Sequence, residues 1–429
     1  MHLAQLYAST NWSSFFPLQD LWLLTSTMAS ARATPEDVEL ADIPTDSVSS
    51  LAFSGKADYL AVGSWDNSVR IYEVSCSQGQ RIHSQGRAMY NHNGPVLTVC
   101  WNEDGTQIFS GSTDTTARIY DIASGQSMQI AQHTEPVKTV KYFVHPQSHS
   151  GILVTGSWDK TLKYWDPRAP TGQPIYSVTL PDNVHDFDVK YPYLVVGTSS
   201  NPNDVSANPI HVFHLDNPTV PYKSLVPPMK KQLRALACFT GLRGTPSGSR
   251  NVLGAGGTDS GPGYIEDRDA SKSYSFKCHR QDTATNSKDQ ALIYAVNDVA
   301  FHPQTKILAT CGSDGVYSYW NLETRTRVKT SFTSGLSTNV ANPTSTPFAP
   351  SSPFNVNTVN RNAYSTNSNS TVLNPPITSI AFNASGNVFA YAVSYDWHKG
   401  YIGNTPGYPN KVFLKRVTDE DLTARSLRR

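Results

Sequence analysis

The sequence predicts an all-β fold, a seven-bladed β-propeller, from three observations. A unit of strand, turn, strand, tight turn and strand recurs along the chain at intervals of about 40–50 residues, the spacing of four-stranded propeller blades. Several of these runs alternate apolar and polar residues, as half-buried strands do. Seven copies of the unit fill most of the chain, and a closed ring of blades leaves no long unpaired sheet edge.

Four copies of the unit are clear. Their first strands are Val48–Phe53, Val96–Trp101, Val137–Tyr142 and Val296–Phe301. Their tight turns hold Asp66, Asp114, Asp159 and Asp314. An Asp side chain accepts hydrogen bonds from the backbone N–H groups of a turn, so we expect these residues to be structural.

Three weaker copies complete the predicted ring. They begin at Val184–Val189, Leu233–Phe239 and Ile377–Phe382, and Val38–Ile43 is expected to add the outermost strand of the last blade. Residues 240–263 are Gly-rich and stand where the fifth blade needs its second and third strands, so this blade is expected to be irregular and incomplete. Residues 333–373 are rich in Ser, Thr, Asn and Pro, which predicts a disordered low-complexity loop.

Composition and chain ends bound the remaining possibilities. The propeller is expected over 35–420, with a disordered or artefactual extension at 1–34 and a tail at 421–429. The formal net charge is +1, so contact with nucleic acid would require a local basic patch. The five cysteines are scattered without a CxxC pair, which favours a reducing compartment. No apolar run approaches the ~20 residues of a membrane span, and the N-terminus is atypical of a signal peptide.

One repeat carries a constellation that resembles the hydrogen-bonded tetrad of WD repeats. It consists of His133, Thr155 or Ser157, Asp159 and Trp165, and His92 with Asp114 repeats part of it. The resemblance assigns these histidines to structure rather than to metal binding or catalysis. No nucleophile elbow, phosphate loop or HExxH sequence is present, and the Cys278-His279 pair lacks partner ligands. We therefore expect no enzyme activity, no metal and no cofactor.

The candidate functional residues form an aromatic and basic cluster. Trp320, Arg325, Arg327 and Lys329 follow one another closely, and Phe276 with Lys277 occurs one repeat earlier. Tryptophan and arginine dominate the energetics of protein interfaces, so we predict a partner-binding site here. The alternative is a solvated turn with ordinary basic residues. A second basic run, Lys230, Lys231 and Arg234, is too short to indicate nucleic acid.

Four strings give a closer family resemblance. They are Phe276-Lys-Cys-His-Arg280, Ala300-Phe-His-Pro303, Gly312-Ser-Asp-Gly315 and Ser394-Tyr-Asp-Trp-His-Lys-Gly400. With them, the chain resembles the mRNA export factor of the nuclear pore, the Gle-two family of WD-repeat proteins, and the segment from Tyr401 to Lys411 resembles its fungal members. The sequence departs from the family where a Ser-Ile-Glu-Gly-Arg strand is expected and residues 240–263 stand instead.

The resemblance implies a non-catalytic adaptor at the nuclear envelope, able to shuttle to the cytoplasm. It would bind a GLEBS hairpin of an FG-repeat nucleoporin through Phe276, Lys277, Trp320, Arg325 and Arg327, with RNA as a further partner of the basic patch. No membrane or small-molecule substrate is implied. Two alternatives stay open: a spindle-checkpoint WD-repeat protein that binds GLEBS-like segments of checkpoint kinases, and a ubiquitin-ligase substrate receptor, for which Trp165-Asp-Pro-Arg168 fits a short pattern.

Overall fold

The computed structural model describes eleven ranges of the chain, separated by short or long gaps. They are residues 37–76, 81–169, 172–199, 209–226, 232–240, 251–257, 262–267, 273–282, 291–333, 375–405 and 407–423. The regular secondary structure of the described residues is β-strand, apart from a 3-10 turn η3 (Tyr401–Gly403) and one helical turn α1 (Asp419–Leu422). The predicted all-β class is confirmed. The predicted extension at 1–34 and the loop at 333–373, apart from Thr333, lie outside the described residues.

Six four-stranded antiparallel sheets are described with their side chains. The first sheet contains β2 (Val48–Phe53), β3 (Tyr59–Ser64), β4 (Ser68–Ser75) and β5 (His83–Asn91). The second contains β6 (Val96–Trp101), β7 (Gln107–Ser112), β8 (Thr116–Asp121) and β9 (Gln126–Gln132). The third contains β10 (Val137–Val144), β11 (Gly151–Ser157), β12 (Thr161–Trp165) and β13 (Tyr176–Thr179).

The other three lie further along the chain. One contains β14 (Val184–Lys190), β15 (Tyr193–Thr198), β16 (Ile210–His214) and β17 (Asn217–Leu225). The next contains β24 (Val296–Phe301), β25 (Ile307–Gly312), β26 (Val316–Asn321) and β27 (Thr326–Phe332). The last contains β28 (Ile377–Phe382), β29 (Val388–Val393), β30 (Lys411–Arg416) and β1 (Val38–Glu39). β1 pairs with β30, with Val38 opposite Leu414, so the predicted closure between the two chain ends is confirmed, although the strand is shorter than Val38–Ile43.

The sheet at the fifth repeat differs from these six. Its strands are β18 (Leu233–Thr240), β19 (Asn251–Gly257), β20 (Pro262–Asp267) and β21 (Tyr274–Lys277), and only β18 and β21 have described side chains. Residues 240–263, which were expected to be irregular, include β19 and the start of β20. Alternation could not reveal β19, because glycine and alanine supply most of it and the strand is specified by its pairing with β18 and β20.

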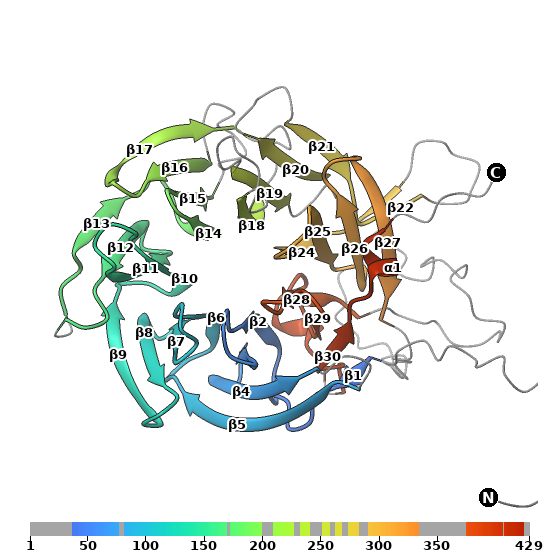
Figure 1. Ribbon diagram of the computed structural model, residues 1–429, viewed down its shortest axis with the longest axis horizontal. Coiled ribbons are helices and arrows are strands. Elements are labelled where there is room, and N and C mark those ends of the chain that lie inside the picture. Colours follow the sequence, from blue (N-terminus) through green and yellow to red (C-terminus); the bar gives the residue numbers. More distant parts are fainter. Residues whose placement is uncertain are drawn as a thin grey trace, which may run out of the picture. The chain divides into compact units, whose positions relative to one another are not determined.

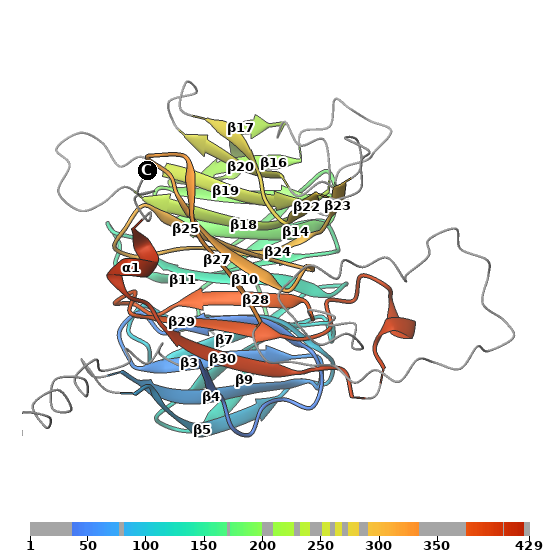
Figure 2. The ribbon, with the colours of Figure 1, turned by 90° about the vertical axis from the view of Figure 1, so that its right-hand side faces the viewer.

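The inner strands close into a ring (Figure 1). β2, β6, β10, β14, β18, β24 and β28 each lie against the next, and β28 lies against β2. A β-propeller, the predicted architecture, is therefore confirmed at the level of fold class. A hairpin of β22 (Arg280–Asp282) and β23 (Ala291–Ile293) and the turn η3 lie toward one face of the ring, and α1 lies toward the other (Figure 2).

The apolar core lies between successive sheets. Phe109 and Val137 belong to one such cluster, and Val154 and Phe187 to the next, and all four side chains are fully buried. Burying an apolar side chain of this size contributes about 1.5–3 kcal/mol. The predicted first strands match β2, β6, β24 and β28 residue for residue, because their alternation reflects one face packed against each neighbouring sheet.

Candidate partner-binding site

The outer edges of two neighbouring sheets bring the predicted binding residues together. Phe276 on β21 and Trp320 at the end of β26 pack with their ring centres 4.7 Å apart. The guanidinium carbon of Arg327, on β27, lies 5.9 Å from the centre of the Trp320 ring. That of Arg325 lies 4.8 Å from the ring of Tyr274. Both arginines are exposed and both aromatic rings are half-buried, so the site presents aromatic faces with cations beside them.

A small cavity adjoins this cluster. Its volume is about 340 Å³, and it is lined by Lys277, Cys278, His279, Arg280 and Arg327. Three of the lining side chains are cationic, and Lys277 and Arg280 are exposed. The residues assigned from sequence did not include Arg280, although it lies in the same Phe276-Lys-Cys-His-Arg280 string. An anionic group on a partner would find hydrogen-bond donors here that match a carboxylate or a phosphate.

The tetrad expected around His133 is formed by four hydrogen bonds. His133 contacts Asp159 Oδ2 through Nδ1 at 2.9 Å and Thr155 Oγ1 through Nε2 at 2.7 Å. Trp165 donates from Nε1 to Thr155 Oγ1 at 2.8 Å, and Thr161 Oγ1 donates to Asp159 Oδ1. Thr155, rather than Ser157, supplies the hydroxyl, since Ser157 donates to the backbone of Glu135. The turn prediction is confirmed too, because Asp159 Oδ1 accepts from the backbone of Thr161.

A second complete tetrad underlies the binding cluster, and sequence reasoning missed it. His279 contacts Asp314 at 2.9 Å and Thr310 at 3.0 Å, and Trp320 donates from Nε1 to Thr310 Oγ1 at 3.0 Å. Cys278-His279 is therefore part of the fold. Trp320 is both structural and half-exposed, so only its ring face is available to a partner. The signal was present, because Thr310, Asp314 and Trp320 repeat the spacing of Thr155, Asp159 and Trp165.

Lys329 differs from the other predicted binding residues in having an ion-pair partner within the protein. Its ammonium forms an ion pair with Asp421 of α1, whose side chain is 8 % exposed. Asp421 is itself buried and accepts from the backbone N–H of Thr418. The ion pair fastens α1 to β27, so the Lys329 ammonium already has a partner within the protein, and its place in the binding site stays a prediction. Residue 421, the predicted start of the tail, lies within α1, and the predicted domain bounds stay predictions as well.

Comparisons with known proteins agree with the repeat pattern. Residues 51–145 match the model described as anaphase-promoting complex subunit 4 WD40 domain, and residues 125–166 and 290–321 match WD domain, G-beta repeat. The chain is 41 % identical to "Poly(A)+ RNA export protein" of Schizosaccharomyces pombe, over 94 % of this chain and 96 % of that protein. It is 37 % identical to "mRNA export factor GLE2" of Chaetomium thermophilum, over 94 % and 95 %, and 35 % identical to "Protein Rae1" of Drosophila melanogaster, over 90 % and 95 %.

The chain belongs to the mRNA export factor family of WD-repeat proteins. The predicted resemblance is confirmed. In this family member, none of the five cysteines forms a disulfide, and the described residues contain no group of three metal-ligating side chains. Within the same ranges, no helix is long and apolar enough to cross a membrane.

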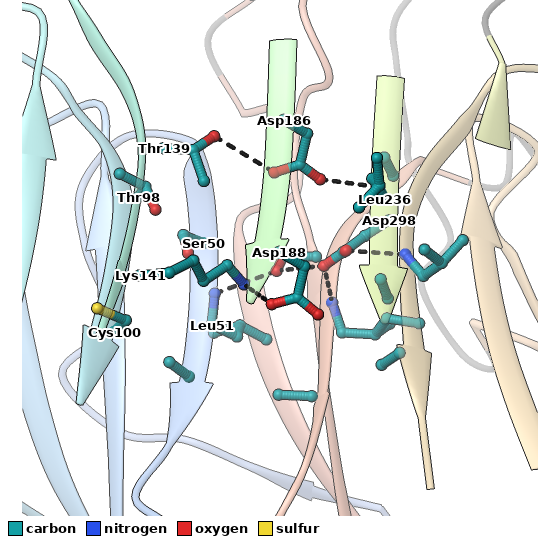
Figure 3. Close-up of a pocket in the computed structure, with 18 of the residues that line it drawn as sticks. Ser50, Leu51, Thr98, Cys100, Thr139, Lys141, Asp186, Asp188, Leu236 and Asp298 are labelled. Atoms are coloured by element: carbon teal, nitrogen blue, oxygen red, sulfur yellow. Dashed lines mark hydrogen bonds and ion pairs between the residues drawn. The ribbon is translucent and has the colours of Figure 1, made fainter. Parts of the chain in front are cut away.

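The centre of this export factor family member holds a charged cavity of about 600 Å³ between the inner strands. Asp186 and Asp188 of β14 project into it beside Lys141 of β10, whose Nζ lies 3.5 Å from Asp188 Oδ1 (Figure 3). Asp298 of β24 and Arg234 of β18 also line it. Arg234, from the second basic run, donates to the backbone carbonyl of Asp396 at 3.1 Å and is therefore committed to the cavity. Lys230 and Lys231 lie outside the described residues.

The burial of Asp186 in this central cavity, which is called the channel below, predicts that the stability of the protein depends on pH. Burial raises the pKa of Asp186 to about 6, although Lys141 and Lys138 nearby oppose the shift. The folded protein thus holds a proton on Asp186 more tightly than the unfolded chain does between the ordinary value of 3.8 and about 6. We expect wild-type stability, relative to Asp186→Asn, to fall as pH rises through this window, by up to ~1.4 kcal/mol per pH unit. Urea unfolding of both proteins from pH 4 to 7 measures this difference, and parallel pH curves would contradict it.

Proposed function

We propose that this protein is a non-catalytic adaptor of the nuclear pore that binds a GLEBS-type nucleoporin hairpin and supports export of poly(A) mRNA. The observation that carries the proposal is similarity to proteins named as RNA or mRNA export factors along 94 % of the chain. On this proposal, the protein acts in the nucleus and at the nuclear envelope and can shuttle to the cytoplasm. On this proposal, the β18–β21 sheet counts as the fifth of seven blades.

The aromatic and cationic edge is the proposed docking site for the hairpin. Phe276 and Trp320 offer ring faces that an apolar side chain can cover, and desolvated aromatic anchors of this kind dominate interface energetics. Lys277, Arg325 and Arg327 are exposed beside them. Acidic residues of the hairpin would gain charge complementarity there, which mainly improves encounter rate and specificity. RNA is a second candidate partner, favoured by the cavity that Lys277, Arg280 and Arg327 line.

Replacing both exposed arginines tests the docking site. We expect the double change Arg325→Glu and Arg327→Glu to weaken binding of a GLEBS peptide by at least ~2 kcal/mol, the scale of an interface hot spot. Both side chains lack a described role in the tetrad, so the fold should survive, unlike in Trp320→Ala, which removes the tetrad hydrogen bond to Thr310. Isothermal titration calorimetry measures the affinity, and circular dichroism checks the fold.

The matched control is Arg81→Glu with Arg87→Glu. These two arginines are also exposed, and they flank or lie on β5, in a sheet that does not contain the proposed site. Arg87 pairs with Glu73 at the surface, a contact of little energetic weight. The control should bind the peptide as wild type does. Wild-type affinity in the Arg325/Arg327 variant would remove the site from this edge.

Depletion in cells separates the pore adaptor from the checkpoint alternative. Accumulation of poly(A) RNA in the nucleus is the expected outcome, whereas normal export with faulty chromosome segregation favours the checkpoint protein. The ubiquitin-ligase alternative draws little support from its motif, because Trp165 serves the tetrad and Arg168 pairs with Asp166 at 3.0 Å. A pull-down in which only a cullin-ligase adaptor binds, and a GLEBS peptide does not, would nevertheless favour it.

A further inference from the structure

Around the central cavity, the side chain of the third residue of an inner strand hydrogen-bonds to the next inner strand in all but one of the described cases; this contact is called the stitch, and the boundary that it crosses is called the seam. These equivalent positions are Ser50, Thr98, Thr139, Asp186, Ala235, Asp298 and Ser379. Ser50 Oγ accepts from the backbone N–H of Val99 at 3.2 Å, and Thr98 Oγ1 accepts from that of Val140 at 3.4 Å. Ser379 Oγ accepts from Leu51 at 3.1 Å, which ties the last sheet to the first.

Where the position is an aspartate, the stitch has two parts. Asp186 Oδ2 accepts from the backbone of Leu236 in the following sheet at 2.8 Å, and Asp298 Oδ2 accepts from Ile380 at 2.9 Å. The other oxygen, Oδ1, accepts from the next residue of its own strand, Phe187 or Val299. Because the backbone N–H of Phe187 or Val299 is already bonded to this oxygen, a side chain of the preceding sheet can complete the stitch only by donating a hydrogen bond to the aspartate. Thr139 does so, from Oγ1 to Asp186 Oδ1 at 3.3 Å (Figure 3).

Ala235 breaks the pattern at one seam. Its methyl group cannot donate to Asp298, so the stitch between β18 and β24 is missing, and no hydrogen bond joins the described residues of these two strands. Apolar contact holds the seam instead: Phe239 and Phe301 stack with ring centres 5.1 Å apart. The neighbouring Arg234 donates to the backbone carbonyl of Asp396, which belongs to neither of the two sheets. Every other pair of adjacent inner strands has a hydrogen bond through the equivalent position.

The seam without a stitch lies between the same two sheets that carry the proposed docking site. Phe276 belongs to the sheet on one side of it, and Trp320 and Arg327 to the sheet on the other. One apolar cluster links the two levels, since Ala235, Val299 and Leu308 are buried together and both Phe276 and Trp320 pack against them. Separation of the two sheets at the channel would therefore pull apart the aromatic pair at the rim.

We propose that the seam between β18 and β24 is the joint at which this ring opens, and that a partner docked across Phe276 and Trp320 closes it. The second half rests on the function proposed above. The first half concerns the free protein alone. Position 235 sets how readily the seam opens, because a hydroxyl there would complete the stitch that Thr139 makes to Asp186 in the equivalent seam.

Hydrogen exchange measured by mass spectrometry on the free, full-length protein tests the joint. In wild type, the amides of β24 should exchange faster than those of β14, the equivalent strand that follows the stitched seam. Ala235→Ser should slow exchange in β24 about fivefold, the factor expected for one net hydrogen bond. Thr139→Ala should speed exchange in β14 by a similar factor, which makes that seam resemble the other and keeps the test valid if Ala235→Ser folds poorly.

Ala52→Ser is the matched control. Ala52 lies on β2 and lines the same cavity, but β2 borders neither side of the seam between β18 and β24. The control should leave exchange in β24 unchanged. Exchange in β24 no faster than in β14, or an Ala235→Ser protein with wild-type exchange in β24, would overturn the joint.

A GLEBS peptide added to the same proteins tests the coupling. Bound peptide should slow exchange in β18 and β24, because a ligand that binds only the closed form stabilises that form. Peptide that binds without protecting these strands overturns the coupling while the proposed function stands. A peptide that does not bind overturns both the proposed function and the coupling, and the exchange of the free protein still decides the joint.

Discussion

His133→Ala is expected to lower the free energy of unfolding by about 3–5 kcal/mol, the cost of truncating a large buried ring that also hydrogen-bonds a buried carboxylate. The His133 side chain is fully buried, and it holds both Asp159 and Thr155. Without it, the carboxylate of Asp159 keeps its turn bonds but loses a buried partner, and the missing ring leaves a cavity beside Trp165. Urea unfolding followed by tryptophan fluorescence gives the free energy.

His83→Ala is the control for this prediction. His83 is exposed on β5, an outer strand, so its replacement should change stability by less than about 0.5 kcal/mol. His279→Ala extends the comparison, because His279 occupies the same place in the second tetrad and should cost a similar amount. Equal stability of His133→Ala and His83→Ala would show that the tetrad does not fasten its sheet.

The repeat pattern predicts inner strands better than it predicts what joins them. Val48–Phe53, Val96–Trp101 and Val296–Phe301 match their strands because period-two alternation is a local property. His279 was missed for a related reason. His133 stands directly before its inner strand, whereas the β22–β23 hairpin separates His279 from Val296. The inserted hairpin moves His279 away from its expected place just before the inner strand, although its partners Thr310 and Asp314 keep the tetrad spacing.

The candidate site was predictable in its residues but not in its geometry. Phe276 lies 44 residues before Trp320 in the chain, and only the packing of two successive sheets brings the two rings together. Lys329 is a cation close in sequence to other predicted binding residues, yet its partner Asp421 lies 92 positions away. No local pattern could therefore reveal that Lys329 forms an ion pair within the protein. Long-range pairing decides which cations of a basic run are exposed to a partner and which are held by the protein itself.

Gly111→Val is expected to destabilise the protein by about 3 kcal/mol, the upper range for overpacking a filled core. Gly111 lies on β7, where the next inner strand approaches closely. A Cβ atom at this position would lie 2.7 Å from a methyl carbon of Val137, 2.9 Å from one of Thr98 and 3.1 Å from one of Val140. Gly63 and Gly156 occupy equivalent positions against Val96 and Val184, so the glycine of the Gly-Ser pair serves packing between sheets rather than turn formation.

Gly86→Val separates this packing effect from the general consequences of replacing a strand glycine. Gly86 lies on the exposed strand β5, and a Cβ atom there meets nothing within 4 Å. Valine favours extended backbone and restricts the unfolded chain, so Gly86→Val should be neutral or slightly stabilising. Thermal unfolding of the two variants should therefore shift in opposite directions or by very different amounts. A loss of stability as large at Gly86 as at Gly111 would mean that backbone entropy or solubility, and not the approach of Val137, limits these positions to glycine.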